Sequence, residues 1–135
     1  RFDISMLTDR LVQMIDWVRS YNLISTLPIG LFGASTGAAA ALDAAAARPE
    51  FVRAVVSRGG RPDLARLLAE VKAPTLLIVG GNDTTVLRMN REALDRLGCT
   101  KELKVIPGAT HLFEEPGTLE AAAAAAGAWF QQCLQ

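Results

Sequence analysis

The feature that most constrains the fold of this chain is an alternation of helical and extended segments along all 135 residues. Strands separated by helices in this way run parallel to one another. Residues 75–79 are apolar on both faces, as expected of a central parallel strand. The pattern predicts an α/β fold, an open parallel sheet of four strands with helices on both faces. The expected strands are residues 29–32, 51–57, 75–79 and 101–106, and the expected helices are residues 4–21, 38–47, 62–71, 86–97 and 115–134.

Apolar spacing also predicts which helix faces are buried. The first helix has an apolar stripe at three- and four-residue spacing, typical of an amphipathic helix. The stripe comprises Met6, Leu7, Leu11, Met14, Ile15 and Val18. The buried side of the last helix is expected to comprise Leu119, Trp129, Phe130 and Leu134. Glu114, Glu115 and Glu120 stand near its start, where the helix dipole favours negative charge.

The charge balance excludes several classes of partner. The chain has 14 Lys and Arg residues against 14 Asp and Glu residues, so its formal net charge is zero. Such a balance predicts no binding to nucleic acid or to an anionic membrane. No apolar run reaches the roughly 18–20 residues that a membrane span needs. Half of the residues are hydrophobic, which is enough for a sizeable core.

The cysteine and histidine content predicts a metal-free protein of the cytoplasm. Cys99 and Cys133 lie far apart without CxxC spacing, so they form no disulfide framework, and a reducing compartment is expected. With a single histidine, a structural zinc site is not expected. The first residues lack the features of a signal peptide and there is no initiator Met, so we expect the chain to begin inside a longer gene product.

One pentapeptide carries a chemical signature. Gly33-Ala34-Ser35-Thr36-Gly37 lies between an expected strand and an expected helix. This is the setting of a nucleophile elbow, a sharp turn that raises the serine hydroxyl above the sheet. Side chains at positions 33 and 37 are expected to collide with neighbouring backbone, which would require glycine at both. The start of the helix points free N–H groups at the group that Ser35 attacks.

A serine nucleophile needs a base, and His111 is the only histidine in the chain. It follows the last expected strand, and Asp83 follows the strand before it. Taken singly, His111 fits a solvated loop side chain and Asp83 an ordinary turn residue. Together with Ser35 they would gather at the carboxyl edge of a parallel sheet. They predict a nucleophile (Ser35), an orienting acid (Asp83) and a general base (His111), with the backbone N–H of Thr36 as an oxyanion donor.

The chain resembles the C-terminal portion of a dienelactone-hydrolase-like α/β-hydrolase, whose catalytic residues also occur in the order Ser, Asp, His. It is similar to bacterial hydrolase domains that are fused behind a phosphoribosyltransferase domain. The resemblance implies a serine esterase that cleaves small acyl esters without a cofactor. Dienelactone hydrolase itself uses a cysteine, so Ser35 favours general carboxylester hydrolysis over the dienelactone substrate. The matching segments are residues 30–39, 56–63, 80–83 and 107–113.

Measured against that family, the chain carries only the last four strands of the fold. The second oxyanion donor of the family comes from a loop after an earlier strand, and no such segment exists here. The outer edge of strand 29–32 would then be unpaired, and an exposed apolar edge invites association. We therefore expect an N-terminal portion to be lost, removed or supplied by another chain. The expected partners are this missing half or a second copy, besides a small ester substrate.

Four residues near the strand ends have two interpretations each. Arg58 and Arg61 follow a strand, so they could line the site and meet a substrate carboxylate, or they could pair with Asp63, Glu50 or a helix C-terminus. Leu112 and Phe113 flank His111 and could form an apolar wall of the acyl pocket or pack in the core.

Two other functions stay open at this point. Gly30, Gly33 and Gly37 loosely resemble a Rossmann phosphate turn, but the spacing and the acidic ribose residue are missing. The second alternative is a catalytically inert hydrolase-fold fragment that serves as an interaction or structural domain, which the missing oxyanion loop favours.

Overall fold

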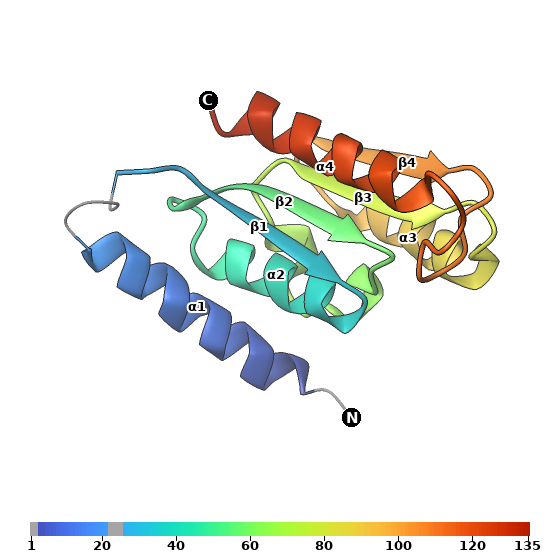
Figure 1. The fold of residues 1–135 in the computed structure, drawn as a ribbon. Coiled ribbons are helices and arrows are strands. Elements are labelled where there is room, and N and C mark those ends of the chain that lie inside the picture. Colours follow the sequence, from blue (N-terminus) through green and yellow to red (C-terminus); the bar gives the residue numbers. More distant parts are fainter. Residues whose placement is uncertain (1–2, 22–25) are drawn as a thin grey trace.

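The structure is a computed structural model, and it describes residues 3–21 and 26–135. Four parallel strands form one sheet in the order β1-β2-β3-β4, so each strand pairs with the next one in the sequence (Figure 1). This confirms the predicted parallel α/β fold. The strands are β1 (Ile29–Ala34), β2 (Val52–Arg58), β3 (Thr75–Gly80) and β4 (Lys101–Ile106).

Helices cover both faces of the sheet. One face carries α2 and α3, with α1 packed on the outside of α2, and the other face carries α4 (Figure 1). The helices are α1 (Ile4–Ser20), α2 (Thr36–Ala47), α3 (Thr84–Arg96) and α4 (Thr118–Cys133). Among the residues described, no helix combines the length and the apolar character that a membrane crossing requires.

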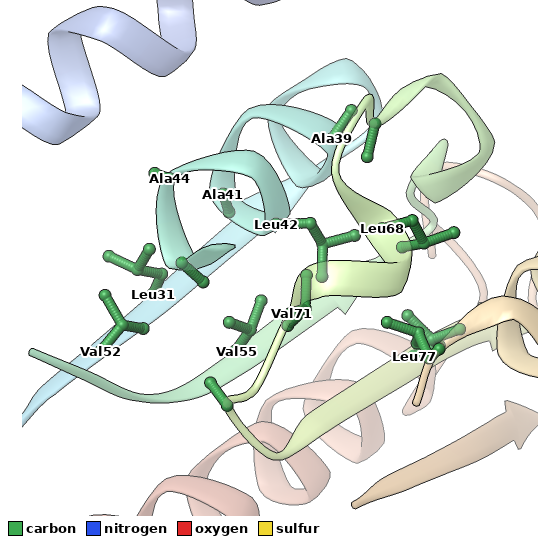
Figure 2. Close-up of a cluster of buried hydrophobic side chains, with 14 of the residues drawn as sticks. Leu31, Ala39, Ala41, Leu42, Ala44, Val52, Val55, Leu68, Val71 and Leu77 are labelled. Carbon is green, nitrogen blue, oxygen red and sulfur yellow. The ribbon is translucent and has the colours of Figure 1, made fainter. Parts of the chain in front are cut away.

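Alternation along the strands divides the core into two clusters. Leu31, Val55 and Leu77 face α2 and α3, while Val56 and Ile78 face α4 (Figure 2 shows the first cluster). Every residue of β3 is buried, as predicted for a central parallel strand. The buried face of α2 is almost entirely alanine, and these small side chains allow the helix to lie close to the sheet.

The prediction of one helix over residues 62–71 is wrong. The chain instead forms two short 3₁₀ helices, η1 (Pro62–Leu64) and η2 (Leu68–Glu70). The cause is the buried carboxylate of Asp43 on α2, which accepts hydrogen bonds from the backbone N–H groups of Arg66 at 3.0 Å and Leu67 at 2.8 Å. Because these N–H groups point at Asp43, they are not available to continue a helix.

Two of the predicted helix faces are less buried than expected. On α1, the side chains of Met6 and Met14 are 44% and 63% exposed, because the helix packs on α2 along a narrow line centred on Ile15. On α4, Leu119 is 49% exposed, since it lines an open groove with Phe32 of β1. Trp129 of the same helix is buried as predicted.

The two hydrogen bonds that Asp43 accepts predict how its replacement changes the free energy of unfolding. Replacement Asp43→Asn keeps the volume but turns an amide group toward two N–H donors, so at least one loses its acceptor. We expect the free energy of unfolding to fall by about 1–3 kcal/mol. Urea unfolding followed by circular dichroism measures this, with Asp95→Asn on the exposed side of α3 as the control. Equal unfolding midpoints for the two variants would show that Asp43 does not hold this segment.

Candidate active site

The site is built on a strained turn between β1 and α2. Ser35 caps the N-terminus of α2 and has φ 51° and ψ −126°, a conformation that residues other than glycine rarely adopt. Such strain costs about 1–3 kcal/mol, and it persists because the surrounding structure imposes it. The carbonyl of Ser35 accepts backbone hydrogen bonds from Ala38 at 3.2 Å and Arg61 at 3.0 Å. The turn is therefore held from both sides.

The two glycines of the elbow have different roles. A Cβ at Gly33 would lie 2.5 Å from the Gly37 carbonyl oxygen and 2.7 Å from the backbone nitrogen of Ala38. Glycine is therefore required at position 33, as predicted. For Gly37 the prediction of a backbone collision is wrong, because a Cβ there would meet nothing within 4 Å among the described residues.

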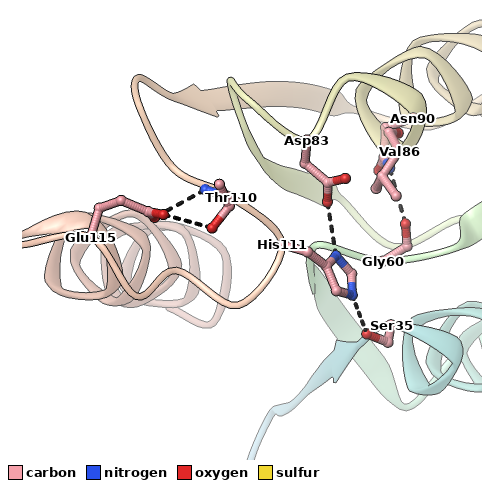
Figure 3. A network of polar contacts seen from close by, with 8 residues as sticks. All are labelled: Ser35, Gly60, Asp83, Val86, Asn90, Thr110, His111 and Glu115. Atoms are coloured by element: carbon pink, nitrogen blue, oxygen red, sulfur yellow. Dashed lines mark hydrogen bonds and ion pairs between the residues drawn. The ribbon is translucent and has the colours of Figure 1, made fainter.

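The three predicted side chains form one hydrogen-bonded chain. Ser35 Oγ lies 3.1 Å from His111 Nε2, and His111 Nδ1 lies 2.8 Å from Asp83 Oδ2 (Figure 3). They come from the turns after β1, β4 and β3, which all end at the same edge of the sheet. With the imidazole neutral and its Nδ1–H donating to Asp83, Nε2 is free to accept the hydroxyl proton of Ser35.

Exposure differs along this chain of side chains. The Asp83 side chain is 14% exposed, whereas that of His111 is 41% exposed. The carboxylate is thus mostly removed from water, and the imidazole has an edge open to a bound molecule. Thr36 is the first residue of α2, and the N–H groups of a first helical turn have no carbonyl partner inside the helix.

The turns that carry Asp83 and His111 are in direct contact. A Cβ at Gly80 would lie 2.3 Å from the Ala109 carbonyl oxygen, so the two turns approach as closely as glycine allows. The same carbonyl accepts a hydrogen bond from the N–H of Asn82 at 2.9 Å. This contact sets the distance between the acid and the imidazole through backbone rather than through flexible side chains.

The loop that carries His111 is held by Glu115. The Glu115 carboxylate accepts hydrogen bonds from the backbone N–H of Thr110 at 3.0 Å and from its hydroxyl at 2.6 Å (Figure 3). These bonds, first of all the one from the hydroxyl, hold the pKa of Glu115 below its usual range. The predicted start of the last helix at Glu115 is consequently wrong, and α4 begins at Thr118.

The two predicted arginines differ in whether they form an ion pair. Arg61 forms a bidentate ion pair with Asp63, with distances of 3.0 and 2.9 Å, so the pairing interpretation holds for it. Its guanidinium keeps the pKa of Asp63 below the usual range. Arg58 forms no ion pair among the described residues and lies over the Phe113 ring, 5.2 Å from its centroid. It also lines the groove of about 230 Å³ that contains Phe32.

Leu112 and Phe113 point in different directions. Leu112 is 66% exposed and follows His111 directly in the sequence. Phe113 is 2% exposed and belongs to the core cluster under α4, so the core interpretation holds and its place in a pocket wall is wrong. Phe113 also has φ 56°, a strained value that its burial stabilises.

Sequence reasoning missed two polar residues beside the site, Glu115 and Asn90. Asn90 stands where an apolar residue is expected on α3, between Leu87 and Ala93, and this break in the apolar stripe was the available signal. For Glu115 the sequence contained only an acidic residue near a helix start. Among residues 3–21 and 26–135, no group of three or more His, Cys, Asp or Glu side chains is arranged to hold a metal ion.

Comparison with known proteins gives two kinds of match. The family model described as "Dienelactone hydrolase family" matches residues 3–134. The crystal structure of a dienelactone hydrolase from Anabaena variabilis is 57% identical, with a TM-score of 0.98, and the match covers 100% of this chain and 63% of that one. An α/β serine hydrolase without a lid from Xanthomonas campestris is 25% identical, with a TM-score of 0.75 over 94% of this chain and 56% of its own.

Two curated proteins of Mycobacterium tuberculosis, both named putative phosphoribosyl transferase, are 56% identical over 130 residues. The match covers 96% of this chain but only 29% of their length. This small share is consistent with the resemblance to hydrolase domains fused behind a phosphoribosyltransferase domain. The family model that matches this chain is that of the dienelactone hydrolases and not one of phosphoribosyl transferases.

The contrast between the two glycines predicts opposite effects of the same substitution. Gly33→Ala should lower the free energy of unfolding by about 1–3 kcal/mol, because the added methyl group meets backbone. Gly37→Ala should raise it by about 0.5–1 kcal/mol, because alanine is the better helix former where space is open. Urea unfolding of both variants measures the difference. Similar shifts in the same direction would contradict the packing described for the elbow.

The bonds to Glu115 predict a pH-dependent contribution to stability. Since the pKa of Glu115 is lowered in the folded state, its contribution is complete above the ordinary glutamate pKa and is lost as pH falls through the lowered value. The difference in unfolding free energy between the parent chain and Glu115→Gln should therefore be largest near neutral pH and disappear in acid. Urea midpoints across this range test it, with exposed Glu114→Gln as the control. A difference that stays constant with pH would exclude this role.

Proposed function

This chain belongs to the dienelactone hydrolase family, and on that premise we propose that it is a serine hydrolase that cleaves small carboxylic esters through an acyl-enzyme on Ser35. The observation that carries the proposal is the hydrogen-bonded chain of Ser35, His111 and Asp83, with contacts of 3.1 and 2.8 Å. A solvated loop histidine would bond to water, whereas both ring nitrogens of His111 contact protein groups, the hydroxyl of Ser35 and the carboxylate of Asp83.

In the first step, Ser35 Oγ attacks the carbonyl carbon of the ester. As the new C–O bond forms, His111 Nε2 accepts the hydroxyl proton as general base. The imidazole then carries a positive charge, which the Asp83 carboxylate stabilises through the 2.8 Å contact with Nδ1–H. The low exposure of Asp83 strengthens this interaction because less water screens it.

The carbonyl oxygen of the ester becomes negatively charged in the tetrahedral intermediate and needs a hydrogen-bond donor. The backbone N–H of Thr36 serves as this donor, at the positive end of the α2 dipole. His111 then returns the proton to the leaving alkoxide, the ester C–O bond breaks and the alcohol departs. A water molecule, deprotonated by the same imidazole, then attacks the acyl carbon; the bond to Ser35 Oγ breaks as His111 returns the proton to that oxygen, and the carboxylic acid departs.

Two side chains border the proposed substrate site, those of Arg58 and Leu112. Ala34, which precedes the nucleophile, pairs with Arg58 in the sheet, so Arg58 stands at the same edge of the sheet as Ser35. Its guanidinium and the exposed Leu112 side chain are the groups proposed to contact the substrate. No cofactor takes part in this mechanism. The reaction is proposed to take place in the cytoplasm of a bacterium, on the strength of the cysteine content and of the resemblance.

The proposal includes a further polypeptide segment along β1. Within the described part of the chain, β1 pairs only with β2, and Phe32 on it is 52% exposed. This chain covers 63% of the Anabaena relative and 29% of the mycobacterial relatives. A segment of the same gene product that pairs with β1 would cover this edge and provide the second oxyanion donor, whereas a second copy of this chain would cover the edge only.

Covalent labelling tests the proposed nucleophile. Incubation with a fluorophosphonate should add one adduct to the intact mass of the chain, because His111 activates the Ser35 hydroxyl. Ser35→Ala should abolish the adduct, while Ser20→Ala on the exposed surface of α1 should keep it. Labelling that persists in Ser35→Ala would place the nucleophile elsewhere.

The same assay separates the esterase from the inert fragment. Labelling that appears only when a segment pairing with β1 is supplied would show that the site is completed by that segment. A folded chain that stays unlabelled both with and without the segment would overturn the esterase proposal. The interaction-domain alternative would then take its place.

A further inference from the structure

The loop that follows β2 carries none of the three proposed catalytic side chains, yet it lies next to both Ser35 and His111. Gly59, Gly60 and Arg61 follow β2 and pass behind the site. A Cβ at Gly59 would make an ordinary contact, 3.5 Å from Cε1 and Nδ1 of His111, so little more than a methyl group fits between this backbone and the imidazole. Two positions later, the N–H of Arg61 donates to the carbonyl of Ser35 at 3.0 Å.

One buried side chain ties this loop to the helix that begins after Asp83. Asn90 on α3 is fully buried, and its Nδ2 donates to the Gly60 carbonyl at 3.0 Å and to the Val86 carbonyl at 2.8 Å (Figure 3). Since both neighbours are acceptors, only the amide NH₂ group can face them, and the orientation of the amide is determined. Asp83 caps the N-terminus of the same helix.

The loop has little room to move once it is attached. A Cβ at Gly60 would lie 2.0 Å from Ser57 Oγ and 2.5 Å from Ala38 Cβ, so the backbone of Gly60 is pressed between β2 and α2. The N–H of Gly59 donates to the Ile78 carbonyl at 2.7 Å. Asn90 approaches from α3 and supplies the remaining attachment, at the carbonyl of Gly60.

An asparagine at position 90 is less favourable for packing than an apolar residue would be. Its Oδ1 atom is buried and has no hydrogen-bond partner among the described residues, and a buried unpaired oxygen costs free energy. A leucine has the same number and branching of side-chain heavy atoms and would stand on the apolar side of α3 without this cost. Packing therefore does not explain an asparagine at this position, and the two hydrogen bonds that it donates point to another role.

We propose that Asn90 is a positioning residue for the Ser35–His111–Asp83 chain and acts through the carbonyl of Gly60. It fixes the backbone of Gly59 near the Cε1–Nδ1 edge of the imidazole, which limits the space into which the ring can turn away from Asp83 and Ser35. The inference rests on the proposed function for its kinetic consequence, but the placement of the imidazole can be measured without catalysis.

Two substitutions remove the bonds in different ways. Asn90→Asp keeps the shape but leaves at most one O–H donor for two carbonyl oxygens, and Asn90→Leu keeps the number and branching of the side-chain heavy atoms without polar atoms. With p-nitrophenyl acetate as substrate, both should lower kcat about tenfold to a hundredfold while KM changes little, because misplacement of a reacting group by about 1 Å has effects of this size. Ala93→Gly on the same helix is the control, since it weakens α3 without touching Gly60.

A spectroscopic measurement addresses the imidazole itself. His111 is the only histidine, so the downfield proton resonance of its hydrogen-bonded Nδ1–H needs no assignment. In folded Asn90→Leu this resonance should shift or broaden, whereas in Ala93→Gly it should stay unchanged. An unchanged resonance in both folded Asn90 variants would overturn the inference, whether or not the chain labels with fluorophosphonate. Failure of labelling with a perturbed resonance would count against the esterase and not against the role of Asn90.

Discussion

The arrangement of the whole site depends on the parallel pairing of four strands in sequential order. Parallel strands end at the same edge, so the turns after β1, β3 and β4 are brought together whatever their side chains are. The close approach of Gly80 to Ala109 then determines how near two of these turns lie. The hydrogen-bonded chain of Ser35, His111 and Asp83 is a consequence of this backbone geometry, since each side chain only has to extend from a turn that is already in place.

Two residues of the site have strained backbone conformations, the proposed nucleophile Ser35 and Phe113 two positions after His111. Contacts outside the reacting groups stabilise both of them. Ser35 is held by backbone bonds to its carbonyl, and Phe113 is held by burial under α4. Polar side chains hold the intervening segments, with Glu115 bound to Thr110 and Asn90 bound to Gly60. The rigidity needed for proton transfer is thus supplied by residues that take no part in the chemistry.

Much of this could be predicted from the sequence. The strands, their parallel direction and the placement of Ser35, Asp83 and His111 follow from local patterns and from one topological rule. What could not be predicted depends on contacts between distant segments. Asp43 diverts residues 66 and 67 from a helix, and nothing within that segment reveals it. The exposure of Leu119 depends on what covers β1, and the difference between Gly33 and Gly37 depends on how α2 approaches the strand.

The sequential strand order also has a consequence for how the molecule is made. Each strand finds its sheet partner among residues synthesised just before it, so the sheet can grow in the direction of synthesis with short loop closures. The imidazole of His111, however, is 76 residues further along the chain than the Ser35 hydroxyl that it contacts. A nascent chain therefore displays the elbow long before it possesses the base. The contact between hydroxyl and imidazole can form only late in synthesis, after all four strands of the sheet have been made.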